Sequence, residues 1–229
     1  MLAYPVSKKP IDYTDKVFIQ PKLDGVRCLI QAELVTDGAG YYKPGVSVVA
    51  YSRTGKEWKN IEHILEELVP FFAKHPKVIL DGELYNHDLK NDFEKIISLV
   101  RKTKPTEDDR FESYEKVQFH CYDTVMEHID FQGRHKFIRD NFGRNSRAYP
   151  YPSIRALMAA TVHEIEEVEA YHESFLELGY EGSILRKNEK YECKRSWTLM
   201  KVKDFSDAEA TIVGFVEGKG KRKGTLGKF

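Results

Sequence analysis

Short apolar runs bounded by turn-forming residues recur along this 229-residue chain and predict a fold rich in β-strands. Runs of Val, Ile, Leu, Phe and Tyr that span only a few residues between turn signals favour strands over helices. On this basis we expect strands at 16–22, 26–34, 46–55, 77–86, 116–125, 179–187 and 198–205.

Four longer segments, 60–75, 91–102, 133–142 and 161–178, are predicted to be helices. In the first of them Ile61, Ile64 and Leu68 recur at the spacing of one helix face. Asn60, just before them, is of the type that caps a helix N-terminus. The polar stretch TKPTEDDR (103–110) predicts a loop.

Two Asp-Gly pairs stand within the predicted strands. Asp24-Gly25 separates the first two strands and predicts a tight turn, and Asp81-Gly82 resembles a turn near the middle of 77–86. Strands with interspersed helices predict an α+β domain built on antiparallel sheets. Because another β-rich unit begins at 209–218, we expect a boundary near Phe205–Asp207, with one domain at 1–206 and a second beginning at 207–229.

The composition is that of a soluble globular protein, with 41% hydrophobic and 31% charged residues. No apolar run approaches the roughly 20 residues of a membrane span, and the N-terminal stretch lacks the apolar core of an export signal. The three cysteines are widely spaced and form no CxxC pair, which favours reduced thiols. We therefore expect a cytoplasmic protein without a membrane partner.

The 36 basic and 36 acidic residues cancel, so net charge identifies no partner. Their distribution is uneven, because 163–181 is acidic and GKGKRKGTLGK (218–228) is strongly basic. The acidic stretch is typical of a solvated helix face. The basic stretch could be a solvated loop or a patch that contacts phosphates.

Four short motifs that can carry chemistry occur in order along the chain. They are Lys22-x-Asp24-Gly25-x-Arg27, Asp81-Gly82-Glu83, Glu181-Gly182 and Lys201-x-Lys203. Each is weak alone, since Asp-Gly and Glu-Gly are common in turns. Their joint occurrence, each at a strand or at a strand end, is the informative observation.

In this order the motifs resemble those of the covalent nucleotidyltransferase superfamily, specifically the ATP-dependent DNA ligases and most closely the small ligases of phages. The similar segments are KLDGVR (22–27) for motif I, LDGEL (80–84) for motif III, FHCYD (119–123) for motif IIIa, EGSILRK (181–187) for motif IV and LMKVK (199–203) for motif V. SRTG (52–55) resembles the short ligase motif that follows motif I. The resemblance spans 16–205 and implies an ATP-grasp-like nucleotidyltransferase domain.

The resemblance implies that Lys22 becomes adenylylated by ATP. An amine that attacks the α-phosphorus of a nucleoside triphosphate must be unprotonated, and nearby cations lower its pKa. Lys201 and Lys203 have the period of one strand face. Together with Arg27 they would surround the phosphates and the reacting centre with positive charge.

A divalent cation, Mg²⁺ (or Mn²⁺), is expected beside the triphosphate. Carboxylates are the side chains that bind such hard cations, and Glu83 and Glu181 are the candidates. The resemblance also places Glu83 against the ribose. Each glutamate could instead be a solvated acid at a strand end.

By the same resemblance, Tyr122 would stack on the purine, Gln20 would read the adenine edge, and Arg53 would contact phosphate of the nick. Ordinary structural explanations stay open for all three. Tyr122 could be a core aromatic, Arg53 a surface turn residue and Gln20 a residue of local structure. Asp24 could serve the turn alone.

The sequence departs from the family pattern in three places. Arg186 stands where the family often has lysine, which keeps the charge although arginine and lysine donate differently. Tyr122 stands where phenylalanine is frequent, and either ring can stack. The basic motif VI of the family's OB-fold domain is absent before Phe229, so we expect 207–229 to be only the start of such a domain.

The expected function is that of an ATP-dependent DNA ligase, which acts as a monomer on nicked duplex DNA in a bacterial or phage-infected cytosol. Lys22 would form lysyl-AMP, the AMP would pass to the 5′-phosphate, and the 3′-hydroxyl would displace it. Three alternatives stay open: an RNA ligase, an mRNA capping guanylyltransferase, or a nick-binding module with little turnover.

Overall fold

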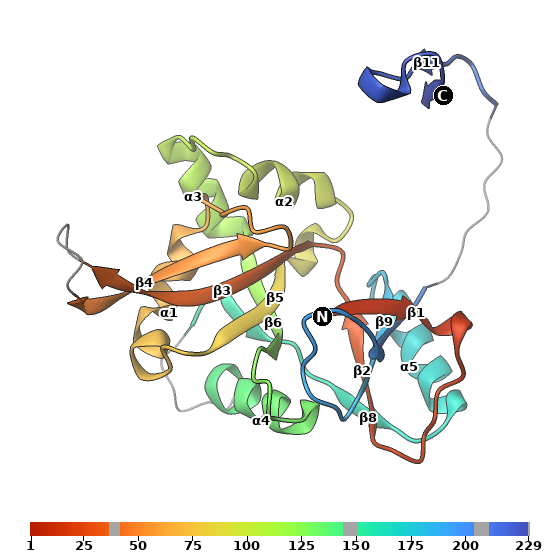
Figure 1. Ribbon diagram of the computed structural model, residues 1–229, viewed down its shortest axis with the longest axis horizontal. Coiled ribbons are helices and arrows are strands. Elements are labelled where there is room, and N and C mark those ends of the chain that lie inside the picture. Colours follow the sequence, from red (N-terminus) through yellow and green to blue (C-terminus); the bar gives the residue numbers. More distant parts are fainter. Residues whose placement is uncertain (37–41, 144–150, 204–210, 229) are drawn as a thin grey trace.

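The computed structural model describes residues 1–36, 42–143, 151–203 and 211–228 (Figure 1). Within this part of the chain, the first ten strands form two five-stranded sheets. Sheet 1 has the order β1 (Leu2–Pro5), β10 (Arg195–Val202), β9 (Gly182–Lys187), β2 (Val17–Lys22), β8 (Ala160–Val162). Sheet 2 has the order β4 (Tyr42–Ser52), β3 (Val26–Thr36), β5 (Ile79–Tyr85), β6 (Gln118–Thr124), β7 (Ile154–Ala156).

Both sheets are mostly antiparallel, and each carries one parallel pair at an edge. In sheet 1 this pair is β1 with β10, and in sheet 2 it is β6 with β7. The chain passes from sheet 1 to sheet 2 directly after Lys22, where β2 ends, and enters β3 at Val26. The lysine to which the sequence analysis assigned the reaction therefore lies where the chain crosses between the sheets. Figure 1 shows this crossing from β2 to β3.

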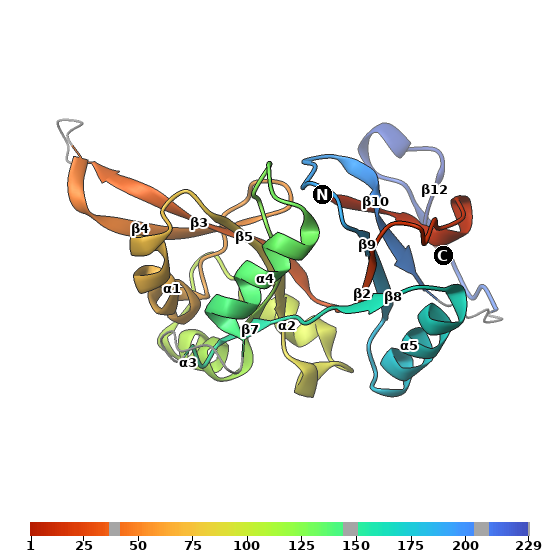
Figure 2. The ribbon, with the colours of Figure 1, turned by 90° about the horizontal axis from the view of Figure 1, so that it is seen from below.

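Helices cover the sheets and close two separate cores. The helices are α1 (Glu62–Lys74), α2 (Phe93–Val100), α3 (Glu107–Lys116), α4 (Phe131–Phe142) and α5 (Ile165–Glu177). Short 3₁₀ turns occur at Val6–Lys8, His87–Leu89 and Gly220–Arg222. Side chains of α1, α2 and α4, among them Leu68, Leu99 and Ile138, bury the larger core with sheet 2. Helix α5 lies against sheet 1 (Figure 2), and its Val168 packs there with Ile19 and Leu185.

Most predicted strands and helices are confirmed within a few residues, but Asp81-Gly82 is not a turn. Both residues lie inside the continuous strand β5, paired with β3 and β6. A Cβ at Gly82 would lie 2.5 Å from the carbonyl oxygen of His120 and equally close to the ring of Phe119. Gly82 therefore permits close packing against the neighbouring strand, which is the other use of glycine within a sheet.

Three further details of the sequence prediction are wrong. Residues 107–110 begin helix α3, which Thr106 and Asp109 cap reciprocally in a capping box. Residues 160–162 form β8, so the helix predicted at 161–178 begins only at Ile165. Asn60 does not cap α1, because the N-cap of this helix is Ile61. The side-chain amide of Asn60 instead donates to the carbonyls of Leu99 and Asp109.

The described C-terminal residues form a short hairpin of β11 (Val216–Glu217) and β12 (Leu226–Lys228). The boundary predicted near Phe205–Asp207 lies outside the described residues. Among the described helices none is long and apolar enough to cross a membrane.

Candidate active site

A cavity of about 540 Å³ lies where the two sheets meet. Its lining comes from strands of both sheets, from connecting segments and from helix α2. The predicted site residues that line it are Gln20, Lys22, Arg27, Arg53, Glu83 and Tyr122. Asp81, Leu157, Ile184 and Arg186 are also part of the wall.

The turn after Lys22 brings sheet 1 against β5 of sheet 2. A Cβ at Gly25 would lie 2.5 Å from the carbonyl oxygen of Leu84 and 2.6 Å from Cγ of Glu83. Only glycine allows this approach without movement of the strand. The Asp-Gly pair of the first motif therefore sets the separation between Lys22 and Glu83.

Glu181 lies between two lysines beside the cavity, where strand β2 ends. Its two carboxylate oxygens form ion pairs with Nζ of Lys22 and with Nζ of Lys203. The backbone N–H of Glu181 also donates to the carbonyl of Lys22. All three side chains keep between 21% and 33% of their surface exposed, so solvent and ligands can reach them.

The glycine after Glu181 makes this arrangement possible. Gly182 pairs with Lys22 across β9 and β2 and has a φ of +145°, a conformation that L-residues rarely adopt. A Cβ there would lie 2.4 Å from the carbonyl oxygen of Val202 on β10. The Glu-Gly motif thus lets three strands converge beside the lysine.

Burial shifts the titration of the two groups that face each other across this part of the cavity. It lowers the pKa of the Lys22 ammonium, although the carboxylates of Glu83 and Asp24 act in the opposite direction. It raises the pKa of Glu83 to about 8, with the charge of Asp81 adding to the effect and Lys22 and Arg27 opposing it. A lowered lysine pKa is the condition for a nucleophilic amine.

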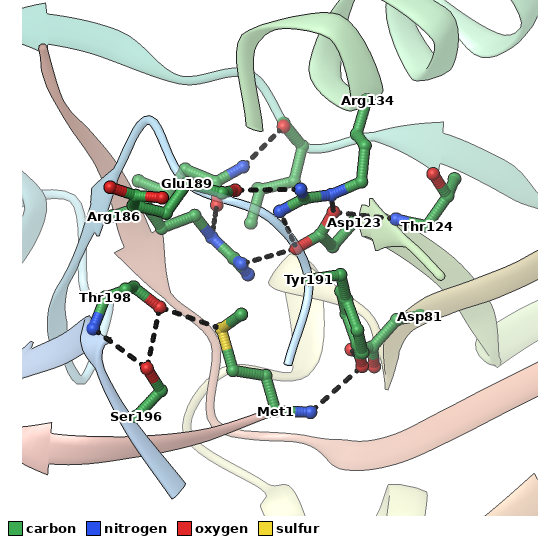
Figure 3. Close-up of polar contacts among 12 residues, drawn as sticks. Met1, Asp81, Asp123, Thr124, Arg134, Arg186, Glu189, Tyr191, Ser196 and Thr198 are labelled. Carbon is green, nitrogen blue, oxygen red and sulfur yellow. Dashed lines mark hydrogen bonds and ion pairs between the residues drawn. The ribbon is translucent and has the colours of Figure 1, made fainter. Parts of the chain in front are cut away.

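Arg27 is held by a carboxylate to which the sequence motifs alone assign no role. Its Nε and Nη2 donate to the two oxygens of the buried Asp81 at 2.9 and 2.8 Å. The hydroxyl of Tyr191, which lies beside Asp81 in Figure 3, donates to that carboxylate at 2.7 Å. Nη1 of Arg27 donates to the carbonyl of Met1 at 2.5 Å. Arg27 therefore lines the cavity as a positive charge whose position is fixed by Asp81 and by the Met1 carbonyl.

The opposite wall contains the two residues predicted to contact the base. Gln20 is buried, and its Nε2 donates to the carbonyl of Leu157 at 2.9 Å while its Oε1 accepts from Nε of Arg186 at 2.7 Å. The ring of Tyr122 is partly exposed and lies 5.4 Å from the guanidinium carbon of Arg186. The Tyr122 hydroxyl points towards Glu83, at 3.5 Å from its Oε2.

Arg186 also belongs to a buried cluster of charged side chains. Its Nη1 donates to Oδ2 of Asp123 at 2.7 Å, and Arg134 of α4 donates to both oxygens of the same carboxylate at 2.7 and 3.2 Å (Figure 3). Asp123 and Arg134 are 0% and 1% exposed. One carboxylate between two arginines is fully paired, as a buried charge must be.

The remaining predicted residues lie at the edges of the site. Arg53 is exposed in the turn after β4 and reaches the cavity rim, which Lys56 and Arg101 also line. Lys201 lies on β10 opposite Ile184, a lining residue, and shares its strand face with Lys203. The structure thus places the predicted residues in or beside one cavity.

No cluster of three metal-ligating side chains occurs among the described residues. Glu83 and Glu181 supply two carboxylates, both of which act on Lys22. Two carboxylates suit Mg²⁺, which is usually held by one or two of them together with substrate phosphates and water. The donor set therefore fits a magnesium ion that arrives with a triphosphate.

Sequence reasoning missed the roles of Asp81, Asp123 and Arg134. The sequence did contain an indication of these roles. Both aspartates lie within predicted strands that are rich in apolar residues, and a buried acid requires a cationic partner. Arg134 follows Phe131 and precedes Ile138 at the spacing of a buried helix face. A charged residue at such a position predicts a buried ion pair.

Two mostly antiparallel sheets that enclose a cavity with a partly buried lysine and flanking carboxylates define a nucleotidyltransferase domain. Residues 1–203 match the family model of the ATP dependent DNA ligase domain. The chain belongs to this family, and the resemblance stated from its motifs is confirmed.

Curated and structural relatives agree with this assignment. A DNA ligase of African swine fever virus is 28% identical over 222 residues, which cover 94% of this chain and 48% of the viral protein. The chain therefore spans about half the length of the curated relatives it matches. A solved Lig E DNA ligase is 26% identical with a TM-score of 0.70, covering 99% of this chain and 77% of that one.

The fold extends to a more distant structure. The ATP-dependent DNA ligase of bacteriophage T7, solved in complex with ATP, superposes with a TM-score of 0.63 at 18% identity. This likeness covers 98% of the present chain and 74% of the phage chain. The α+β nucleotidyltransferase fold predicted from the sequence is therefore confirmed.

Proposed function

We propose that this chain is the adenylation part of an ATP-dependent DNA ligase and that Lys22 carries the AMP. The observation on which this rests is the arrangement of Lys22, which lines the cavity, with Glu181 and Lys203 beside it. Glu181 positions the amine between two sheets, and burial lowers the pKa of Lys22. Membership of the ligase family supplies the reaction class.

In the first step the uncharged Nζ of Lys22 attacks the α-phosphorus of ATP. The new P–N bond forms as the bond from the α-phosphorus to the bridging oxygen breaks, pyrophosphate leaves, and the amine releases its proton to solvent. Lys203 and Arg27 favour the developing negative charge, which is the main contribution of a protein to phosphoryl-type transfers. Lys201, on the same strand face as Lys203, is proposed for the same role.

A bound Mg²⁺ (or Mn²⁺) would neutralise charge on the phosphates of ATP. Glu83 and Glu181 are proposed to hold it. A divalent cation favours the carboxylate form, so it would offset the burial that raises the pKa of Glu83 to about 8. Glu83 is also proposed to contact the ribose.

Base and nick contacts complete the proposed site. The exposed face of Tyr122 would stack on adenine, Gln20 would read its edge, and Arg53 at the rim would contact a phosphate of nicked duplex DNA. AMP would pass to the 5′-phosphate, and the 3′-hydroxyl would displace it to seal the strand. Residues 1–206 are proposed as the adenylation domain of a monomer, with an OB-type domain beginning at 207.

Covalent labelling tests the first step. The chain is incubated with ATP labelled at the α-phosphate and then denatured. We expect stable label on the native sequence and none on Lys22→Ala, because of the two lysines that Glu181 holds, Lys22 is the one that lines the cavity. Equal labelling of both proteins would refute Lys22 as the nucleophile.

The same assay separates the related enzymes of this superfamily. Labelling from GTP in preference to ATP would indicate a capping guanylyltransferase. If ATP is preferred, sealing of nicked DNA against nicked RNA separates the two kinds of ligase. We expect ATP and nicked DNA.

A further inference from the structure

The amide of Gln20 is fixed in one of its two possible orientations. The side-chain amide of glutamine can be turned over, which exchanges its oxygen and its nitrogen. Here one neighbour is the Leu157 carbonyl, which can only accept, and the other is the guanidinium of Arg186, which can only donate. The nitrogen must therefore face Leu157 and the oxygen must face Arg186.

Arg186 is itself immobilised, so it can act as a rigid reference. It is 5% exposed, its Nη1 donates to Asp123 at 2.7 Å, and Arg134 holds the far side of that carboxylate (Figure 3). The guanidinium carbon also lies 5.0 Å from the ring centroid of Phe131 and 5.4 Å from that of Tyr122. Arg186 thus contacts both Gln20 and Tyr122, the two residues that are proposed to contact the base.

Each end of the Gln20 amide still has capacity towards a ligand. Its oxygen has a second lone pair, its nitrogen a second hydrogen, and Gln20, Arg186 and Leu157 all line the cavity. Adenine presents an amino donor at position 6 beside a ring-nitrogen acceptor, whereas guanine presents an oxygen acceptor at position 6 beside a ring N–H donor. An amide that pairs with one base in a given orientation opposes donor to donor and acceptor to acceptor with the other.

We propose that Arg186 determines the choice of adenine over guanine by fixing the orientation of the Gln20 amide. It acts as a positioning residue and does not itself touch the reacting atoms. The inference rests on the proposed function only in taking the cavity as the nucleotide site. Lysine, common at this position in the family, can also donate to the Gln20 oxygen, so it preserves the orientation.

Equilibrium binding of ATP and GTP tests the proposal without requiring the covalent step. Dissociation constants for both nucleotides are measured in a Lys22→Ala background, with and without Arg186→Met. Methionine removes the donor, so the amide can turn over, and we expect the GTP-to-ATP ratio of dissociation constants to fall by about tenfold. Arg186→Lys should keep the ratio within about threefold of the parent.

Lys187→Met is the matched control, because it removes one positive charge from the next position of β9, whose side chain points to the opposite face. A general loss of structure would weaken both nucleotides and leave the ratio unchanged. An unchanged ratio in an Arg186→Met protein that still binds ATP as tightly as the parent, or an equal fall in Lys187→Met, would overturn the proposal.

A second variant decides the question if Arg186→Met does not fold. Gln20→Met removes the amide, so it must abolish the same preference; retention of the parent ratio would overturn the inference. Failure of Lys22-dependent labelling would contradict the proposed ligase function, whereas these binding ratios would still report on Arg186.

Discussion

At the scale of single residues, the cavity brings together groups whose charged forms are disfavoured by burial. Glu83 faces Lys22 inside the cavity, and its pKa is raised to about 8. The native state therefore binds a proton that the unfolded chain releases near the ordinary value of 4.5. The contribution of Glu83 to stability therefore falls as the pH rises from about 4.5 towards 8, because its native form holds more protons over that range.

Replacing Glu83 with glutamine removes this dependence. We expect Glu83→Gln to unfold at about the same temperature as the parent near pH 4.5 and at a temperature higher by ~3 °C or more at pH 8.5. Thermal unfolding followed by circular dichroism at the two pH values measures the difference. The exposed Glu94→Gln serves as control and should shift neither value.

An equal effect of Glu83→Gln at both pH values would contradict the assigned pKa. Stabilisation at high pH would also be consistent with a functional role for Glu83. A carboxylate that weakens the free protein is expected at a site where a metal ion and a nucleotide later stabilise its charge.

At the scale of elements, glycines decide how closely the strands of the site approach. Gly182 has a φ of +145°, and a Cβ at this position would lie only 2.4 Å from the carbonyl oxygen of Val202. We expect Gly182→Ala to lower the free energy of unfolding by about 2 kcal/mol or more, because it adds both backbone strain and a steric clash. Urea unfolding measures this change.

Gly214→Ala is the control for the loss of a glycine as such. A Cβ at Gly214 meets nothing within 4 Å, so this substitution should leave the free energy of unfolding nearly unchanged. Equal stability of the two variants would show that β9 and β10 can move apart at no cost. The ion pairs of Glu181 would then need another explanation for their placement.

Helices and strands could be predicted from the sequence where one face of the element is buried and its apolar residues recur with a regular local spacing. Apolar periodicity located α1 and the strands around Lys22, whereas the exposed Phe111 and Tyr114 of α3 gave no amphipathic pattern. The capping box at Thr106 was the available signal for that helix. Asp81-Gly82 was misjudged because the reason for its glycine, the ring of Phe119, lies on another strand.

The site was predictable as a set of residues but not as a set of contacts. Motif order indicated Lys22, Glu83, Glu181 and Lys203, and all four lie in or beside one cavity. The pairing of Asp81 with Arg27, and of Asp123 with Arg134 and Arg186, depends on tertiary packing between both sheets and α4. No local sequence pattern identifies which cationic side chain pairs with which buried acid.

At the scale of the whole molecule, the described C-terminal residues differ from the rest in having little buried apolar surface. Ile212, Val213 and Phe215 are 65%, 97% and 78% exposed, and Leu226 is 57% exposed. Side chains of this kind normally lie within a β-domain core. Their exposure supports the proposal that 207–229 belongs to a second domain and contributes little to the stability of 1–206.

Truncation after residue 206 separates folding from DNA binding. We expect 1–206 and 1–229 to unfold at the same temperature, because the described residues among those removed, 211–228, bury little apolar surface. The removed stretch carries Lys219, Lys221, Arg222, Lys223 and Lys228. If these contact DNA phosphates, the dependence of the binding constant for nicked duplex on salt becomes less steep, by about 0.9 in the log–log slope for each lost contact.

The salt series gives the decisive comparison. Binding of both chains to the same nicked duplex is measured by fluorescence anisotropy over several salt concentrations, and we expect the slope to fall by about 1 to 3 on truncation. Identical slopes with identical unfolding temperatures would make the basic stretch a solvated loop. A flatter slope at unchanged stability would instead assign it to the DNA-binding surface, since electrostatic contacts, unlike core packing, can be lost without loosening the fold.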